Sequence, residues 1–105
     1  MDQKSIQKTV TAFVRRIPKK YTPEKIVLFG SRVRGDAKKT SDIDVIVVSK
    51  AFVSISEDDR LYILYKASAF LTPEIHPWAV TPEEYASLDP QTTLGAAKKY
   101  GEAIL

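Results

Sequence analysis

Two aspartates, Asp42 and Asp44, stand one residue apart at the head of an apolar run, and they are the residues of this chain best suited to chemistry. Side chains of a strand alternate between its two faces, so both carboxylates are predicted to point to the same side. Two neighbouring carboxylates repel each other unless a proton or a cation lies between them. Mg²⁺ is the usual cation, because it prefers oxygen ligands and keeps positions open for substrate phosphates. The pair therefore predicts a magnesium site.

A second polar feature, Gly30-Ser31, ends the apolar run 26–29 abruptly. Glycine lets the backbone turn sharply and approach a ligand closely. Ser31 is expected to cap a helical turn whose free N–H groups form an anion site. Amides and a hydroxyl suit a phosphate, while the two carboxylates suit the metal that bridges it. Together the two features predict a site for a polyphosphate and its metal.

Two other interpretations of these residues are less favourable. The glycine and serine could form only a turn, but turn chemistry does not require two aspartates entering an apolar strand. A P-loop is excluded because no Gly-Lys-Ser or Gly-Lys-Thr follows the glycines. The next lysines, Lys38 and Lys39, fall in a predicted polar loop.

The combination of Gly30-Ser31, Gly35 and Ser41-Asp42-Ile43-Asp44 resembles the signature of the DNA polymerase beta-like nucleotidyltransferase superfamily. The short length resembles its minimal nucleotidyltransferases, the MNT type, which are often encoded beside a HEPN-domain partner. The resemblance implies that Asp42 and Asp44 are catalytic metal ligands.

The nucleotide is expected to be bound by Gly30, Ser31, Arg32 and Ser41. For Arg32 two interpretations stay open: its guanidinium contacts a triphosphate through two hydrogen bonds, or it is simply exposed.

The superfamily places a third acid on the next strand, where it binds a second metal ion and helps to activate the attacking hydroxyl. Counting back from Thr81-Pro82, that position falls on His76, and Glu74 lies one pleat away on the same face. Glu74 could complete a two-ion Mg²⁺ site with the two aspartates. Alternatively, His76 takes its place; histidine is a poor Mg²⁺ ligand but can act as a general base.

The resemblance implies an enzyme that moves a nucleoside monophosphate, AMP from ATP in the first instance, to a hydroxyl and releases pyrophosphate. No segment remains for fingers, a thumb or a base-reading domain, so a nucleic-acid template is not expected. In MNT–HEPN pairs the MNT protein acts as antitoxin, and some add AMP to a tyrosine of the HEPN toxin. The alternatives are a catalytically weakened protein that neutralises its partner by binding, and a nucleotide-binding regulatory module.

Composition sets the frame for these expectations. The 105 residues suggest one nucleotidyltransferase domain over 1–105, and the absence of cysteine excludes disulfides and thiolate zinc sites. No apolar run approaches the roughly 20 residues that span a membrane, and the N-terminus lacks a signal-peptide core, so a cytoplasmic protein is expected. The net charge of +3 is mild and suits an anionic nucleotide.

Hydrophobic periodicity predicts helices and strands that are buried on both faces. The resemblance implies an α/β (α+β) fold, in which a small mixed sheet of three or more strands is flanked by helices, as in the polymerase beta-like nucleotidyltransferases. Tyr62 and Tyr65 are interpreted as packing residues of the central helix. The expected elements are a helix over 3–17, strands over 25–29 and 42–49, a loop over 49–56, a helix from Ser56 to about Leu71, an edge or irregular strand over 74–80 containing Pro77, a short helix from Thr81-Pro82, and a last helix from Asp89-Pro90 that carries Leu94, Ala97, Gly101 and Ile104.

Overall fold

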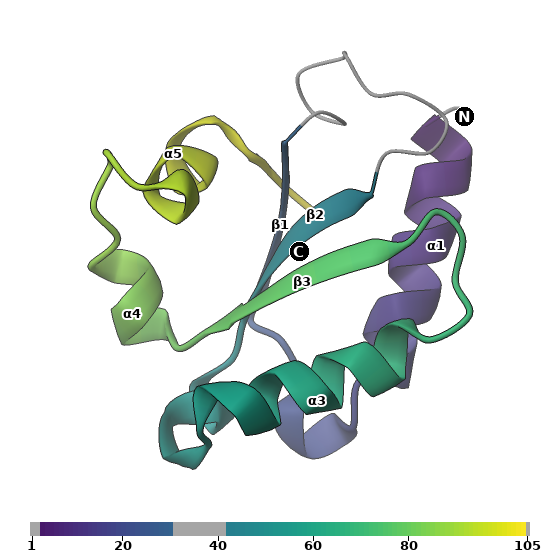
Figure 1. Cartoon of the computed structure of the whole chain (residues 1–105), viewed down its shortest axis with the longest axis horizontal. Coiled ribbons are helices and arrows are strands. Elements are labelled where there is room, and N and C mark those ends of the chain that lie inside the picture. Colours follow the sequence, from purple (N-terminus) through teal and green to yellow (C-terminus); the bar gives the residue numbers. More distant parts are fainter. Residues whose placement is uncertain (1–2, 31–41, 105) are drawn as a thin grey trace.

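The computed structural model of the chain describes residues 3–30 and 42–104, with side chains from residue 6 onward within those ranges. A mixed four-stranded sheet in the order β3-β2-β1-β4 lies between two groups of helices (Figure 1). The elements are α1 (Gln3–Arg16), η1 (Lys19–Tyr21), β1 (Lys25–Phe29), β2 (Ile43–Val48), η2 (Lys50–Ser54), α3 (Glu57–Ser68), β3 (Ile75–Val80), α4 (Pro82–Ala86), α5 (Thr93–Tyr100) and β4 (Glu102–Ala103). This arrangement confirms the predicted fold class.

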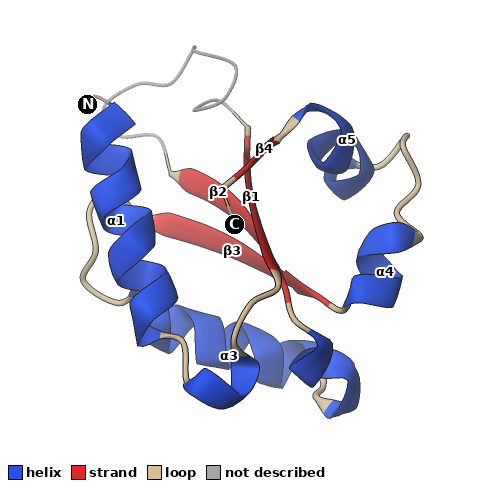
Figure 2. Ribbon diagram, turned by 180° about the vertical axis from the view of Figure 1, so that it is seen from behind, coloured by secondary structure: helices blue, strands red, loops and turns tan. Residues whose placement is uncertain are grey.

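The two central strands explain why the sequence shows apolar runs rather than alternation. β1 pairs antiparallel with β2, and β2 pairs parallel with β3. Helices cover both faces: α1 and α3 lie on one side of the sheet, and α4 and α5 on the other (Figure 2). Strands buried on both faces need apolar residues at nearly every position. Within β2 and β3 the polar side chains, Asp44 and His76, lie near the start of each strand.

Each face of the sheet has its own core. On the side of α1 and α3, Phe13, Phe52 and Leu64 are fully buried against alternate residues of β1 and β2. On the side of α4 and α5, Ile46 and Ala97 are buried together with partly exposed aromatic side chains. The two clusters hold β2 from both sides, which fixes the direction of its polar side chains.

β3 is an edge strand, as the proline within it predicts. Pro77 lies opposite Val45 in the parallel ladder and is buried. Proline lacks a backbone N–H, so it is tolerated where one side of the strand has no neighbour. Among the described residues, no helix is both long and apolar enough to cross a membrane.

The predicted loop over 49–56 is wrong. It contains the 3₁₀ helix η2, whose Phe52 is fully buried, and Ser49 caps it by accepting a hydrogen bond from the Ala51 amide at 3.3 Å. The segment is too short for a helical period to be visible in sequence. Its order comes instead from one aromatic side chain that fills the core.

The C-terminal prediction also needs correction. α5 begins after its cap Thr92, not at Asp89-Pro90, and it ends at Tyr100. Glu102–Ala103 then form β4 along the free edge of β1, and the Ile104 amide donates to the Ile26 carbonyl at 2.9 Å. Ile104 therefore lies on a strand extension rather than on a helical stripe. An unpaired strand edge offers backbone hydrogen bonds that outweigh continuation of a glycine-containing helix.

The prediction that Tyr62 and Tyr65 of α3 are packing residues is wrong. Tyr62 is 63% exposed and Tyr65 is 51% exposed. The Ser56 cap is confirmed, since its hydroxyl accepts from the Asp59 amide at 3.2 Å. The buried face of α3 consists of Arg60, Leu64 and Ala67, so it includes an arginine and leaves both tyrosines outside.

That arginine, Arg60, connects α3 to α4 at the edge of the sheet. Its Nε donates to the Ile55 carbonyl at 2.9 Å, and its Nη1 lies 2.7 Å from Oε1 of Glu84. Glu84 also accepts from the Thr81 amide at 2.7 Å, which completes a capping box for α4. Partial burial alone raises the pKa of Glu84, but the Thr81 amide and the Arg60 guanidinium outweigh it and lower the pKa below its ordinary value.

Acid is therefore expected to weaken this connection. A carboxyl whose pKa is lowered on folding contributes stability above its unfolded pKa and loses it as the pH falls through the folded value. The free energy of unfolding, measured by urea denaturation from pH 7 to pH 3, should fall more for the wild type than for Glu84→Gln. The difference should be at most about 1 kcal/mol, because Glu84 is partly exposed to solvent. Glu83→Gln, an exposed neighbour, should follow the wild-type curve; identical curves for wild type and Glu84→Gln would contradict the assignment.

Candidate active site

Asp44 lies in the middle of a row of three residues that crosses the sheet. It pairs with Phe29 of β1 on one side and with His76 of β3 on the other. Its Oδ1 lies 3.3 Å from Nδ1 of His76, and the two side chains are 27% and 48% exposed. Both groups remain accessible to a ligand at the end of the sheet, where the flanking apolar residues stop.

Gly30 brings the backbone directly against Asp44. Its φ angle of +82° lies in the left-handed region, which side chains disfavour. A Cβ built on Gly30 would overlap Oδ2 of Asp44 and lie 3.3 Å from its Cγ. A glycine is thus required both for the turn after β1 and for the space that the Asp44 carboxylate occupies.

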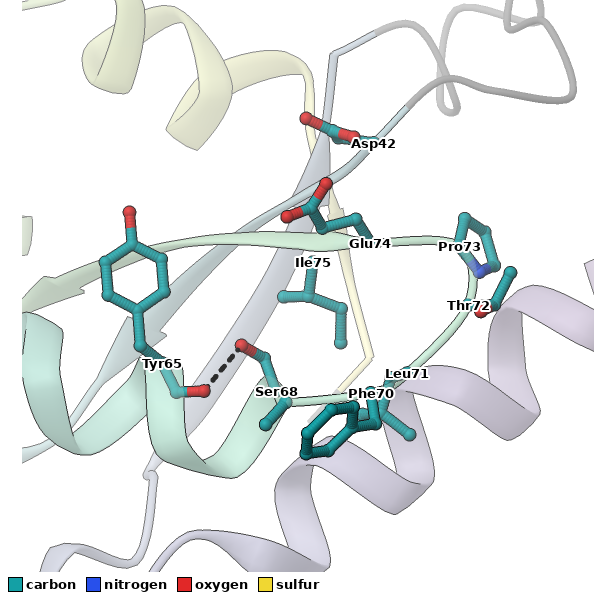
Figure 3. A pocket seen from close by; sticks show the side chains of 10 residues that line it. Asp42, Tyr65, Ser68, Phe70, Leu71, Thr72, Pro73, Glu74 and Ile75 are labelled. Atoms are coloured by element: carbon teal, nitrogen blue, oxygen red, sulfur yellow. Dashed lines mark hydrogen bonds between the residues drawn. The ribbon is translucent and has the colours of Figure 1, made fainter.

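Asp42 and Glu74 form a second row one pleat before Asp44 and His76. The Ile43 amide donates to the Glu74 carbonyl at 2.8 Å, which aligns the two chains at this point. Both side chains are exposed and line a cavity of about 580 Å³ beside the loop that connects α3 to β3. In Figure 3 their carboxylates lie on the same side of β3.

The register also places the two candidates for the third acidic position. His76 is the residue of β3 that lies beside Asp44, and Glu74, one pleat before it, shares its cavity with Asp42. Within residues 3–30 and 42–104, no group of three or more histidine, cysteine or acidic side chains is arranged to hold a metal ion. One or two carboxylates are enough to hold Mg²⁺, which completes its shell with phosphates and water, so the ion at Asp42 and Asp44 stays a prediction. The second ion stays a prediction.

Three predicted nucleotide-binding residues, Ser31, Arg32 and Ser41, lie outside the described residues. The structure therefore places Gly30 and the acidic residues of the site but leaves the rest of the proposed phosphate loop as an expectation from sequence.

Trp78 is a further residue at this site to which the sequence reasoning gave no role. Its ring lies 5.2 Å from the ring of His76 and 6.4 Å from that of Phe29, measured between centroids. Its indole nitrogen is buried and has no hydrogen-bond partner among the described residues. The alternation of Glu74, His76 and Trp78 was the available signal, because it puts all three on the face that carries Asp44.

This sheet order, with an acidic residue of the second strand against a glycine turn, fits the nucleotidyltransferase fold that the sequence predicts. The whole fold is similar to that of a Sulfolobus solfataricus protein assigned as a nucleotidyltransferase, with a TM-score of 0.61 over 98% of this chain and 87% of that one, at 20% identity. This similarity shows the fold.

The chain belongs to the nucleotidyltransferase domain family, whose profile matches residues 7–100. It is 32% identical over 88 residues to a Haemophilus influenzae protein named "Probable protein adenylyltransferase MntA", a match that covers 82% of this chain and 77% of the relative. The protein is thus a nucleotidyltransferase.

Proposed function

We propose that this nucleotidyltransferase transfers AMP from ATP to a hydroxyl group of another protein and releases pyrophosphate. The observation that carries the proposal is the close approach of Gly30 to Asp44, because it sets the turn proposed to bind phosphate against the carboxylate proposed to bind the metal. The choice of AMP and of a protein acceptor is supported by the relative named as a protein adenylyltransferase.

In this proposal one set of residues binds the phosphates and another binds the metal. Gly30 and Ser31 would bind the β- and γ-phosphates, with Arg32 and Ser41 beside them, through amides, hydroxyls and a guanidinium. Asp42 and Asp44 would hold Mg²⁺, which neutralises charge on the phosphates and polarises the reacting phosphoryl group. Positioning and charge neutralisation would then supply most of the rate.

Glu74 is the better supported third carboxylate in this proposal. It shares with Asp42 a cavity large enough to admit an acceptor side chain, and it is exposed there. From that position it could accept a hydrogen bond from the incoming hydroxyl and orient it. His76, beside Asp44, is the alternative occupant of this role.

The acceptor is proposed to be a tyrosine of a HEPN-domain toxin, for which this protein would be the antitoxin. The support is the resemblance of the Gly-Ser and Asp-x-Asp motifs to those of minimal nucleotidyltransferases, together with the relative's name. The specific partner would be a HEPN protein encoded beside this chain.

A second candidate function is a catalytically weakened subunit that neutralises its partner by binding. One observation favours it: the residue that pairs with Asp44 on β3 is a histidine and not an acid. The two candidates differ in one property, because only the enzyme must bind the nucleotide together with the metal.

Calorimetric titration with ATP separates them. We expect ATP to bind in the presence of Mg²⁺ and binding to weaken at least about tenfold when EDTA removes the metal, because the aspartates and phosphates then repel each other. Addition of α-labelled ATP and the HEPN protein should then place label on a tyrosine of the partner. An Asp58→Asn variant, altered at an exposed acid of α3, should behave as the wild type. Equal ATP binding with and without Mg²⁺, or none at all, would leave only the binding subunit.

A further inference from the structure

Tyr65 shares a cavity with the two exposed carboxylates of the site. The cavity of about 580 Å³ is lined by Asp42 and Glu74 on the sheet side and by Tyr65 on the helix side. In Figure 3 the Tyr65 ring rises from α3, and its hydroxyl lies on the same side of β3 as both carboxylates. A hydroxyl of this chain is therefore already present where an acceptor hydroxyl would have to enter.

Tyr65 also shares a cavity with His76, the residue of β3 that pairs with Asp44. A neighbouring cavity of about 480 Å³ is lined by Tyr65 together with His76 and Trp78. The ring thus stands between the part of the site that contains Asp42 and the part that contains His76. Tyr65 is 51% exposed and belongs to neither hydrophobic cluster.

Chemistry favours Tyr65 over the other hydroxyls that line the larger cavity. The Ser68 hydroxyl donates to the Tyr65 carbonyl at 3.1 Å, the contact shown dashed in Figure 3. A phenol gives up its proton more readily than an aliphatic hydroxyl such as that of Thr72. The Tyr65 hydroxyl forms no hydrogen bond with any of the described residues, so no such bond has to break before it reacts.

We propose that Tyr65 is a site of self-modification, at which the enzyme transfers a nucleoside monophosphate to its own side chain. The Tyr65 oxygen forms a bond to the α-phosphorus of the bound nucleotide, and the bond from that phosphorus to the bridging oxygen of the β-phosphate breaks. Pyrophosphate leaves with the electron pair, and the phenolic proton passes to water or to Glu74. The product is a phosphodiester on Tyr65 that occupies the acceptor cavity and thereby competes with a protein acceptor. This inference rests on the proposed nucleotidyl transfer.

The test uses the full chain with Mg²⁺ and α-labelled ATP and no added acceptor. We expect covalent label, a mass increase of one AMP on the intact protein, and location of the adduct on Tyr65 by peptide mass spectrometry. Tyr65→Phe should reduce the label to the background of the Asp44→Asn protein. Tyr62→Phe is the matched control: Tyr62 is on the same helix and 63% exposed but does not line the cavity, so labelling should be unchanged.

Mixing experiments and binding data separate the possible failures. Because the cavity belongs to a single chain, wild-type protein should not label an Asp44→Asn protein that carries a distinguishing tag. Label on that tagged protein, or on a residue other than Tyr65, would overturn the proposal. Mg²⁺-dependent ATP binding without any covalent label would overturn self-modification and leave the proposed function intact, whereas absence of such binding would overturn both.

Discussion

The Asp44→Asn variant is expected to lose nucleotidyl transfer by about 10²–10³-fold while remaining folded. The Asp44 carboxylate lies against Gly30 on one side, and its Oδ1 is 3.3 Å from Nδ1 of His76 on the other, so it is in contact with both the glycine turn and β3. Asparagine keeps the shape and one oxygen but removes the negative charge that binds a cation. Pyrophosphate release at a fixed concentration of Mg-ATP measures the loss.

Two further measurements test whether the loss comes from the metal. The Mg²⁺ concentration needed for half-maximal activity should rise in Asp44→Asn, because one ligand charge is missing. The urea midpoint should change little, since Asp44 is not part of either hydrophobic cluster. Asp58→Asn again serves as the control at an exposed acid. An Asp44→Asn protein with wild-type rates and Mg²⁺ dependence would rule out this carboxylate as the metal ligand.

The sequence was sufficient for the central sheet and for the direction of the acids. Strand alternation placed Asp44 opposite to Ile43 and Val45, and the structure buries both of those residues in one cluster. Continuous apolar runs also predict strands that are covered on both faces. This prediction needs only the local sequence pattern. Local pattern does not decide whether Glu74 or His76 lies beside Asp44. That depends on the register between β2 and β3, two strands far apart in sequence.

The face of α3 could not be predicted from sequence for a physical reason. The hydrophobic spacing predicts one buried stripe of Leu61, Leu64, Tyr65, Ser68 and Leu71. Leu64 is buried as predicted, but the other buried residues of the helix are Arg60 and Ala67, and Tyr65 is exposed. An arginine is buried only where its donors find acceptors, and those of Arg60 come from other elements, including Glu84. A rule based on hydrophobic periodicity treats arginine as a surface residue. It therefore predicts the wrong buried face for α3, and with it a buried Tyr65.

β4 and η2 illustrate a second limit. β4 has two residues, and their conformation depends on the open edge of β1 rather than on their own propensity. η2 depends on a core space that Phe52 fills. Both elements follow from tertiary contacts that exist only after the sheet has formed.

Gly30→Ala is expected to remove activity by displacing Asp44 rather than by unfolding the protein. The new methyl group would overlap Oδ2 of Asp44, and this short side chain can relieve the overlap only by turning away from the site. The φ angle of +82° adds backbone strain, so we expect a loss of about 1–2 kcal/mol in the free energy of unfolding. Pyrophosphate release should fall to the level of the Asp44→Asn protein.

A double-mutant cycle separates the two effects of the methyl group. In an Asp44→Ala background the overlap is gone and only the backbone strain remains, so Gly30→Ala should destabilise that protein less than it destabilises the wild type. A coupling of about 0.5 kcal/mol or more between the two positions is expected from side chains in direct contact. Urea denaturation of the four proteins measures it. Additive free energies together with full activity of Gly30→Ala would show that the turn and the carboxylate do not form one site.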